Sequence, residues 1–124
     1  MSALERYYKS RHGRYKQLLS WRDHITDLSD AAKKVLPDAD VYLFGSAIEG
    51  ELTANSDVDV LIISDRASGL QRHRLVTMIE NGLKVPSIFE IHLTTRDKLE
   101  WYRKHAENLI SIERVVKEQN KAQP

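Results

Sequence analysis

The chain has 124 residues, of which 41% are hydrophobic and 30% are charged, and its formal net charge is +1 at pH 7. This size and composition predict one folded domain over residues 1–124 rather than a disordered chain. The absence of cysteine excludes disulfides and thiolate chemistry. No apolar run approaches the ~20 residues of a membrane-spanning helix, and the first residues lack the apolar core of a signal peptide. We therefore expect a cytoplasmic protein without a membrane partner.

Residues 4–36 are predicted to form an N-terminal helix. Gly13 is a candidate kink within it, and Pro37-Asp38 ends the pattern. One apolar stripe, with steps of three and four residues, would face the core: Leu18, Trp21, Ile25, Leu28, Ala32 and Val35.

The central segment, residues 40–94, contains three short apolar runs that predict strands at 41–44, 58–63 and 88–93. A short helix is expected at 46–50 and a longer one at 68–84. A C-terminal helix is predicted over 95–118. This order of elements predicts an α+β fold in which a small mixed β-sheet has its helices packed on one face. The other face would stay open for a substrate.

The most informative segment runs from Gly45-Ser46 to Asp57-Val58-Asp59. A Gly-Ser turn follows the first strand, and two aspartates open the second. Side chains two positions apart in a strand share a face, so Asp57 and Asp59 are expected to project together. Neighbouring carboxylates repel unless a cation lies between them, and hard oxygen ligands suit Mg²⁺ or Mn²⁺. The turn can offer backbone N–H groups and the Ser46 hydroxyl to a phosphate.

Glu90 and His92 lie on the third predicted strand. If the apolar residues of that strand face the core, alternation places both polar side chains on the face that carries the aspartates. Glu90 would then share a face with the two aspartates. An ordinary exposed residue of an amphipathic strand would show the same pattern. His92 is expected to neighbour the site or to pair with Glu90, because imidazole is not a favoured Mg²⁺ ligand.

Gly45-Ser46, the spacer, and Ser56-Asp57-Val58-Asp59 resemble the signature of the DNA polymerase beta nucleotidyltransferase superfamily. The short chain is similar to the minimal nucleotidyltransferases of HEPN/MNT toxin–antitoxin pairs. This resemblance implies a polymerase beta-like fold, with 40–94 as the catalytic core. It also implies a Mg²⁺- or Mn²⁺-dependent transfer of AMP from ATP, or of another NTP, to a hydroxyl. The residues implied are Gly45, Ser46 and Ser56 for nucleotide binding, and Asp57, Asp59 and Glu90 for catalysis and metal binding.

The resemblance further implies a partner, because family members in such pairs act as antitoxins that bind a HEPN-type helical toxin and adenylylate it. Self-association is a second way to cover apolar surface. One departure matters: many minimal relatives carry arginine after the Gly-Ser pair, whereas this chain has Ala47-Ile48-Glu49. Other cations must then offset the charge of a triphosphate. The candidates, chosen by residue type alone, are Lys33, Lys34, Arg66 and Arg72. The alternative function is therefore a catalytically weak or inactive module that binds a partner or a nucleotide. Transfer to a small molecule or an RNA end ranks last.

Charge is unevenly distributed along the chain. Lys and Arg outnumber acids by six to two over residues 1–24 and by seven to five over 96–124, whereas eleven acids face six bases over 25–95. Solvated helix faces explain the basic ends better than nucleic-acid binding does, because no aromatic-plus-basic platform is evident. Stacking of Trp101 and Tyr102 on a nucleotide base is an alternative to a structural role. Tyr102 falls on the apolar stripe of its predicted helix, which favours a core position.

Overall fold

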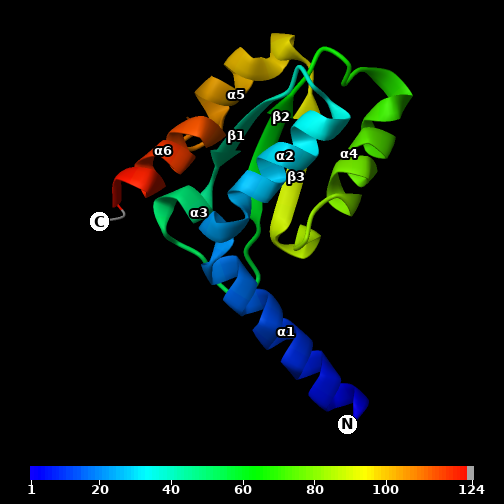
Figure 1. Cartoon of the computed structure of the whole chain (residues 1–124), viewed down its shortest axis with the longest axis vertical. Coiled ribbons are helices and arrows are strands. Elements are labelled where there is room, and N and C mark those ends of the chain that lie inside the picture. Colours follow the sequence, from blue (N-terminus) through cyan, green and yellow to red (C-terminus); the bar gives the residue numbers. More distant parts are fainter. Residues whose placement is uncertain (123–124) are drawn as a thin grey trace.

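The computed structural model describes residues 1–122 and has a four-stranded mixed sheet at its centre (Figure 1). Its strands are β1 (Asp40–Phe44), β2 (Val58–Ile63), β3 (Phe89–Thr94) and β4 (Ile110–Ser111), in the order β3-β2-β1-β4. β1 runs antiparallel to both β2 and β4, and β2 runs parallel to β3. The predicted α+β class with a small mixed sheet is therefore confirmed.

The strand register assigns each side chain to one of two faces. Phe44 lies opposite Asp59, and Asp59 lies beside Glu90 on β3. We call the face that carries these residues the site face; it comprises Asp40, Tyr42, Phe44, Asp59, Leu61, Ile63, Glu90, His92 and Thr94. The opposite core face comprises Val41, Leu43, Val58, Val60, Ile62, Phe89, Ile91 and Leu93.

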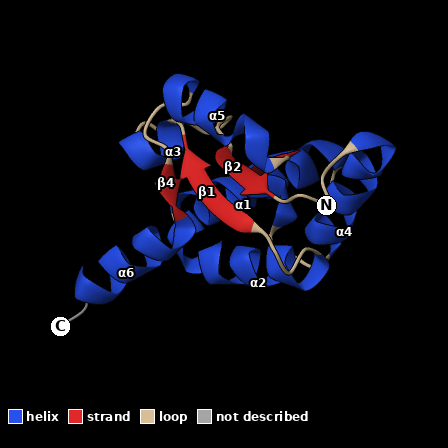
Figure 2. Cartoon of the chain, turned by 90° about the horizontal axis from the view of Figure 1, so that it is seen from above, coloured by secondary structure: helices blue, strands red, loops and turns tan. Residues whose placement is uncertain are grey.

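Helices α2 (Ile25–Val35) and α4 (Arg72–Asn81) pack together on the core face. In Figure 2, α2 lies below the sheet. The two helices bury Ile25, Leu28, Ala31 and Ala32 of α2 and Ile79 of α4 in the core, and α6 (Ile112–Ala122) adds Ile112 and Val115. Full burial of one such aliphatic side chain contributes about 1.5–3 kcal/mol to the hydrophobic term. No helix in the described part of the chain is long and apolar enough to cross a bilayer.

The N-terminal region differs from the single helix predicted over 4–36. It forms α1 (Ala3–Leu19), a 3₁₀ turn at Trp21–His24, and then α2. The break falls at Ser20, whose hydroxyl donates to the carbonyls of Lys16 and Gln17, whereas Gly13 lies within α1. The turn carries Trp21 into the core, where it is 1% exposed. The first two-thirds of α1 is exposed and projects from the body of the molecule (Figure 1).

The C-terminal region is also not one helix over 95–118. It consists of α5 (Leu99–His105), β4 and α6. Asn108 adopts a left-handed conformation (φ 56°) between α5 and β4, which turns the chain so that Ile110 pairs with Leu43. The fold places α5 against the site face, opposite α2 (Figure 2). The site face is therefore open only in part, and its residue Leu61 is fully buried.

The remaining predicted helices form close to their expected positions. The short helix α3 (Ser46–Glu49) follows β1 directly. The helix predicted at 68–84 is a 3₁₀ turn at Gly69–Gln71 followed by α4, which ends before Gly82. α3 lies between β1 and β2, and α4 lies between β2 and β3. These helices therefore help to determine where the acidic residues of β2 and β3 lie.

Candidate active site

Asp59, Glu90 and His92 form a cluster on the site face, near the amino ends of the parallel strands β2 and β3. His92 Nε2 lies 3.9 Å from Asp59 Oδ1 and 3.8 Å from Glu90 Oε1. One ligand atom from each of the three side chains lies within 4.8 Å of the others. An ion with metal–oxygen bonds of about 2.0–2.6 Å spans separations of this size, so the cluster fits one divalent cation.

The electrostatics of the cluster also fit a cation. Burial raises the pKa of Asp59, and the hydrogen bond to Glu90 and the charge of Glu90 raise it further. The charge of Asp57 acts in the same direction, while His92 opposes the shift. The Asp59 side chain is 25% exposed and that of Glu90 is 55% exposed, so an ion can reach both from solvent. Two carboxylates with one imidazole suit Mn²⁺ at least as well as Mg²⁺.

Gly45 lies directly beside this cluster. Its φ is +81°, and a Cβ at this position would overlap Oδ2 of Asp59. The Gly45 N–H donates to the carbonyl of Glu107 at 3.0 Å, so the fold already uses this donor. Within residues 1–122, the N–H groups of Ser46 and Ala47 make no backbone hydrogen bond, and these are the donors that the turn can offer to an anion.

Ser56 lies in the loop that leads into β2. Its hydroxyl accepts from the Thr53 N–H at 2.9 Å, and its own N–H donates to the Thr53 carbonyl at 3.0 Å. The Ser56 side chain therefore closes a turn that positions the following aspartate. Its assignment to nucleotide binding stays a prediction.

Asp57 is not part of the cluster, although it adjoins it. Its carboxylate pairs instead with Arg14 of α1, with 2.5 Å between Nη2 and Oδ1. The same guanidinium donates to the carbonyls of Ala54, Ser56 and Ser87. Arg14 thereby joins α1 to the loops that precede β2 and β3. Sequence reasoning missed this residue, since the only sign of it was the excess of basic residues over 1–24.

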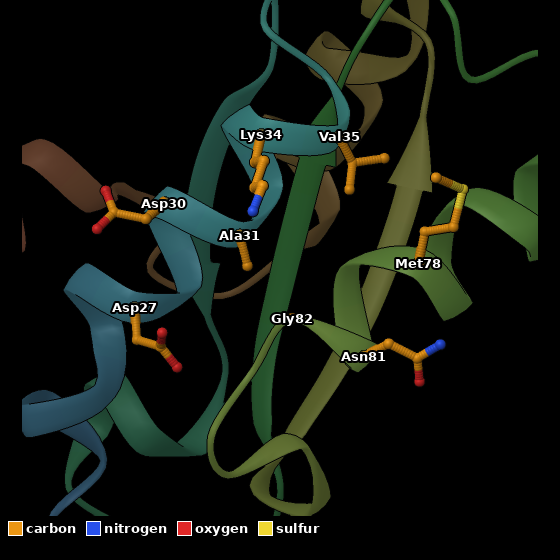
Figure 3. Close-up of a pocket in the computed structure, with 8 residues that line it drawn as sticks. All are labelled: Asp27, Asp30, Ala31, Lys34, Val35, Met78, Asn81 and Gly82. Atoms are coloured by element: carbon orange, nitrogen blue, oxygen red, sulfur yellow. The ribbon is translucent and has the colours of Figure 1, made fainter.

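The cations suggested from sequence lie elsewhere. Lys33 pairs with Glu113 at 3.4 Å, and Arg66 lies close enough to Asp38 to contribute to lowering its pKa. Lys34 lines a pocket of about 600 Å³ between α2 and α4 (Figure 3). That pocket lies on the helix-covered side of the molecule, so the sheet separates it from the cluster. Arg72 lines a different pocket, near the carboxyl end of β3.

Carboxylates on neighbouring strands, with a glycine turn packed against one of them, define a candidate site for metal-dependent phosphate chemistry. The chain belongs to the nucleotidyltransferase domain family, whose sequence model matches residues 25–117. Residues 1–24, which include Arg14, lie outside the matched range.

Two solved structures have a similar fold. A provisionally assigned nucleotidyltransferase from Sulfolobus solfataricus is 13% identical with a TM-score of 0.51, and the match covers 81% of this chain and 82% of that one. Another provisionally assigned nucleotidyltransferase is 24% identical with a TM-score of 0.50, over 69% of this chain and 94% of that one. At such identities the likeness concerns the fold alone. No curated protein matches the chain.

Proposed function

We propose that this chain is a divalent-metal-dependent nucleotidyltransferase that transfers AMP from ATP to a hydroxyl of a partner protein and releases pyrophosphate. The observation that carries this proposal is the pairing of Asp59 with Glu90 across β2 and β3, next to the turn at Gly45. Membership in the nucleotidyltransferase domain family supports the reaction class. The donor ATP, the protein acceptor and the residue roles belong to the proposal.

In the proposed site, Asp59 and Glu90 hold a Mg²⁺ or Mn²⁺ ion, and Asp57 contributes from the edge of the cluster. When bound, such an ion stabilises the negative charge that develops on the transferred phosphoryl group. The N–H groups of Ser46 and Ala47, with the Ser46 hydroxyl, bind the outer phosphates of the nucleotide. Glu90 is the more exposed of the two paired carboxylates, so it is the group that accepts the proton of the incoming hydroxyl.

The proposed acceptor is a tyrosine on a HEPN-type helical protein, as in a toxin–antitoxin pair. The similarity of the Gly45–Asp59 segment to minimal nucleotidyltransferases supports this acceptor. The projecting α1 also gives the chain a long exposed surface for a helical partner (Figure 1). When the chain is incubated with labelled ATP and a co-expressed HEPN-type protein, we expect the label to appear on that protein.

A calorimetric titration of ATP with Mg²⁺ tests the nucleotide site. We expect saturable, metal-dependent binding to the wild type, and loss of that metal-dependent binding in the double variant Asp59→Asn/Glu90→Gln. The matched control is Asp65→Asn/Glu100→Gln, because these carboxylates are 74% and 77% exposed and lie outside the cluster. Equal binding in the wild type and the cluster variant would contradict the proposal.

One observation favours the alternative function of a binding module with weak or no catalysis. Glu49 ends the short helix after the Gly-Ser turn, and its pKa is raised by a hydrogen bond and charge repulsion involving Glu107. Negative charge near a phosphate turn opposes triphosphate binding. If Asp59→Asn/Glu90→Gln neutralises the partner as well as the wild type does, binding rather than chemistry is the function.

A further inference from the structure

A second pocket lies at the carboxyl end of β3, between the start of α4 and α5. Its volume is about 310 Å³. It is lined by Arg72, Thr94, Lys98, Trp101 and Tyr102. Thr94 belongs to the site face and is 7% exposed, whereas Trp101 is 56% exposed. The carboxyl ends of parallel strands are a general location for ligands in sheets of this kind.

The pocket is rich in positive charge and aromatic surface. Arg72 comes from the start of α4 and Lys98 from the turn before α5, and neither forms a salt bridge within residues 1–122. The Arg72 Nε donates to the Ala67 carbonyl at 3.2 Å, which holds the guanidinium in place. Among the residues that the structure describes, no acidic side chain lines the pocket. Lys98 adjoins Asp97 in the sequence, but Asp97 does not line the pocket, so the lining is positively charged and favours an anionic ligand.

The aromatic part of the pocket is held by ring contacts. Trp101 meets Tyr102 edge to face at a centroid distance of 5.1 Å. His105 stacks on the Trp101 indole at 4.5 Å with an angle of 18° between the rings. An indole that is supported in this way is a platform on which a planar ring can stack. The sequence did not reveal this combination, because Arg72 and Trp101 lie 29 positions apart.

The pocket is separate from the acidic cluster, although both lie along β3. Thr94 lies four positions beyond Glu90 on β3, which corresponds to about 13 Å at the rise of a strand. The rings of His92 and Phe44 are 5.5 Å apart, and those of Phe44 and Tyr102 are 6.2 Å apart. These side chains form a wall between the two places. A phosphate between Arg72 and Lys98 is therefore distinct from a triphosphate at the Gly45 turn.

We propose that this pocket binds a nucleoside monophosphate group, with the base stacked on Trp101 and the phosphate between Arg72 and Lys98. The binding requires no divalent ion and no residue of the acidic cluster. This proposal therefore stands independently of the proposed function. Where both hold, the chain binds a second nucleotide besides the donor ATP.

Tryptophan fluorescence tests this proposal with AMP in the presence of EDTA. The chain has two tryptophans, and Trp21 is buried, so quenching by AMP would report Trp101. We expect saturable quenching in the wild type and binding about tenfold weaker, or weaker still, in Arg72→Gln/Lys98→Gln. The control Arg74→Gln/Lys104→Gln makes the same change in charge on exposed positions of α4 and α5 outside the pocket. Circular dichroism confirms that both variants are folded.

Three further arms separate the proposal from its competitors. Adenosine is expected to bind Arg72→Gln/Lys98→Gln and the wild type equally, because it lacks the phosphate. Asp59→Asn/Glu90→Gln is expected to bind AMP as the wild type does, even if it has lost metal-dependent ATP binding. Calorimetry with ATP and Mg²⁺ is expected to give two molecules per chain. No saturable quenching by AMP, an equal loss in the control variant, or one ATP molecule whose binding needs both Asp59 and Trp101 would overturn the proposal.

Discussion

Two features of the structure at position 45 are compatible only with glycine. The backbone has φ +81°, and the space where a Cβ would lie is taken by the Asp59 carboxylate. We expect Gly45→Ala to lower the free energy of unfolding by about 2–4 kcal/mol, since it combines backbone strain with a steric clash. Urea denaturation measures this loss.

Gly50→Ala is the matched control, because Gly50 also has a positive φ, +75°, but no atom of the described part of the chain lies within 4 Å of an added Cβ. Only the strain component, about 1–2 kcal/mol, should appear there. Equal losses in the two variants would mean that the contact with Asp59 contributes nothing.

The raised pKa of Asp59 gives a prediction for stability against pH. The folded chain holds this proton more tightly than the unfolded chain does, so the ionised carboxylate is a penalty at pH values above its folded pKa. We therefore expect Asp59→Asn to stabilise the metal-free chain at pH 7–8, by on the order of 1 kcal/mol. The gain should shrink as the pH falls towards the ordinary aspartate pKa of about 3.9. Urea denaturation in EDTA across this range measures it.

Asp57→Asn should act in the opposite direction at neutral pH, because it removes the partner of Arg14. A stabilised Asp57→Asn, or an Asp59→Asn without any gain at pH 7–8, would contradict these assignments.

The residue pattern predicted part of this arrangement. Alternation along β3 correctly placed Glu90 and His92 away from the core, and β2 brings Asp59 beside Glu90. The pattern did not predict that Asp57 would pair with an arginine 43 positions earlier. Such a contact depends on the angle at which α1 leaves the sheet, and no local signal encodes that angle.

At the scale of elements, Arg14 is the main polar link between α1 and the loops before β2 and β3. We expect Arg14→Gln to increase amide hydrogen exchange in residues 53–57 and 86–88, because three carbonyls lose their donor. Arg11→Gln is the control, since Arg11 bonds only the Tyr7 hydroxyl and the Asn55 side chain within the described residues. A similar increase in both variants would show that α1 as a whole, and not Arg14, orders these loops.

The breaks in the terminal helices show where local pattern fails. Residues 99–116 carry apolar positions at helical spacing, yet Ile110 and Ser111 form a strand. Their pairing with β1 satisfies backbone groups at the sheet edge, and this tertiary gain outweighs the helical preference. The same change of direction moves Tyr102 out of the predicted core and onto the site face, where it contacts Phe44.

At the scale of the whole molecule, burial predicts which part of α1 the fold needs. The first ten residues are exposed, whereas Leu18 is fully buried in the core. Deletion of residues 1–10 should therefore change the free energy of unfolding by less than about 1 kcal/mol. Deletion of residues 1–19 should cost about 2–5 kcal/mol from the loss of Leu18 alone. Thermal denaturation of both truncated chains checks the difference, and a large loss in the shorter deletion would contradict it.

The class of fold was predictable because the three main strands are short apolar runs separated by clear helical segments. The coverage of the sheet was not predictable, since α5 reaches the site face only through the turn at Asn108. The second pocket was not predictable for the same reason, because it is formed where α4 and α5 meet the end of β3.

The register of β2 and β3 also bears on how fast the chain folds. This parallel pair places Asp59 directly beside Glu90, and the connection between its two strands contains α4. Parallel pairing across such a distance carries a high entropic barrier, and here two like charges meet as the strands come together. Divalent cations should therefore shorten the refolding time constant of the wild type and leave that of Asp59→Asn/Glu90→Gln unchanged. Cation binding by the acidic cluster would then speed refolding, in addition to the role proposed for the cluster in the native state.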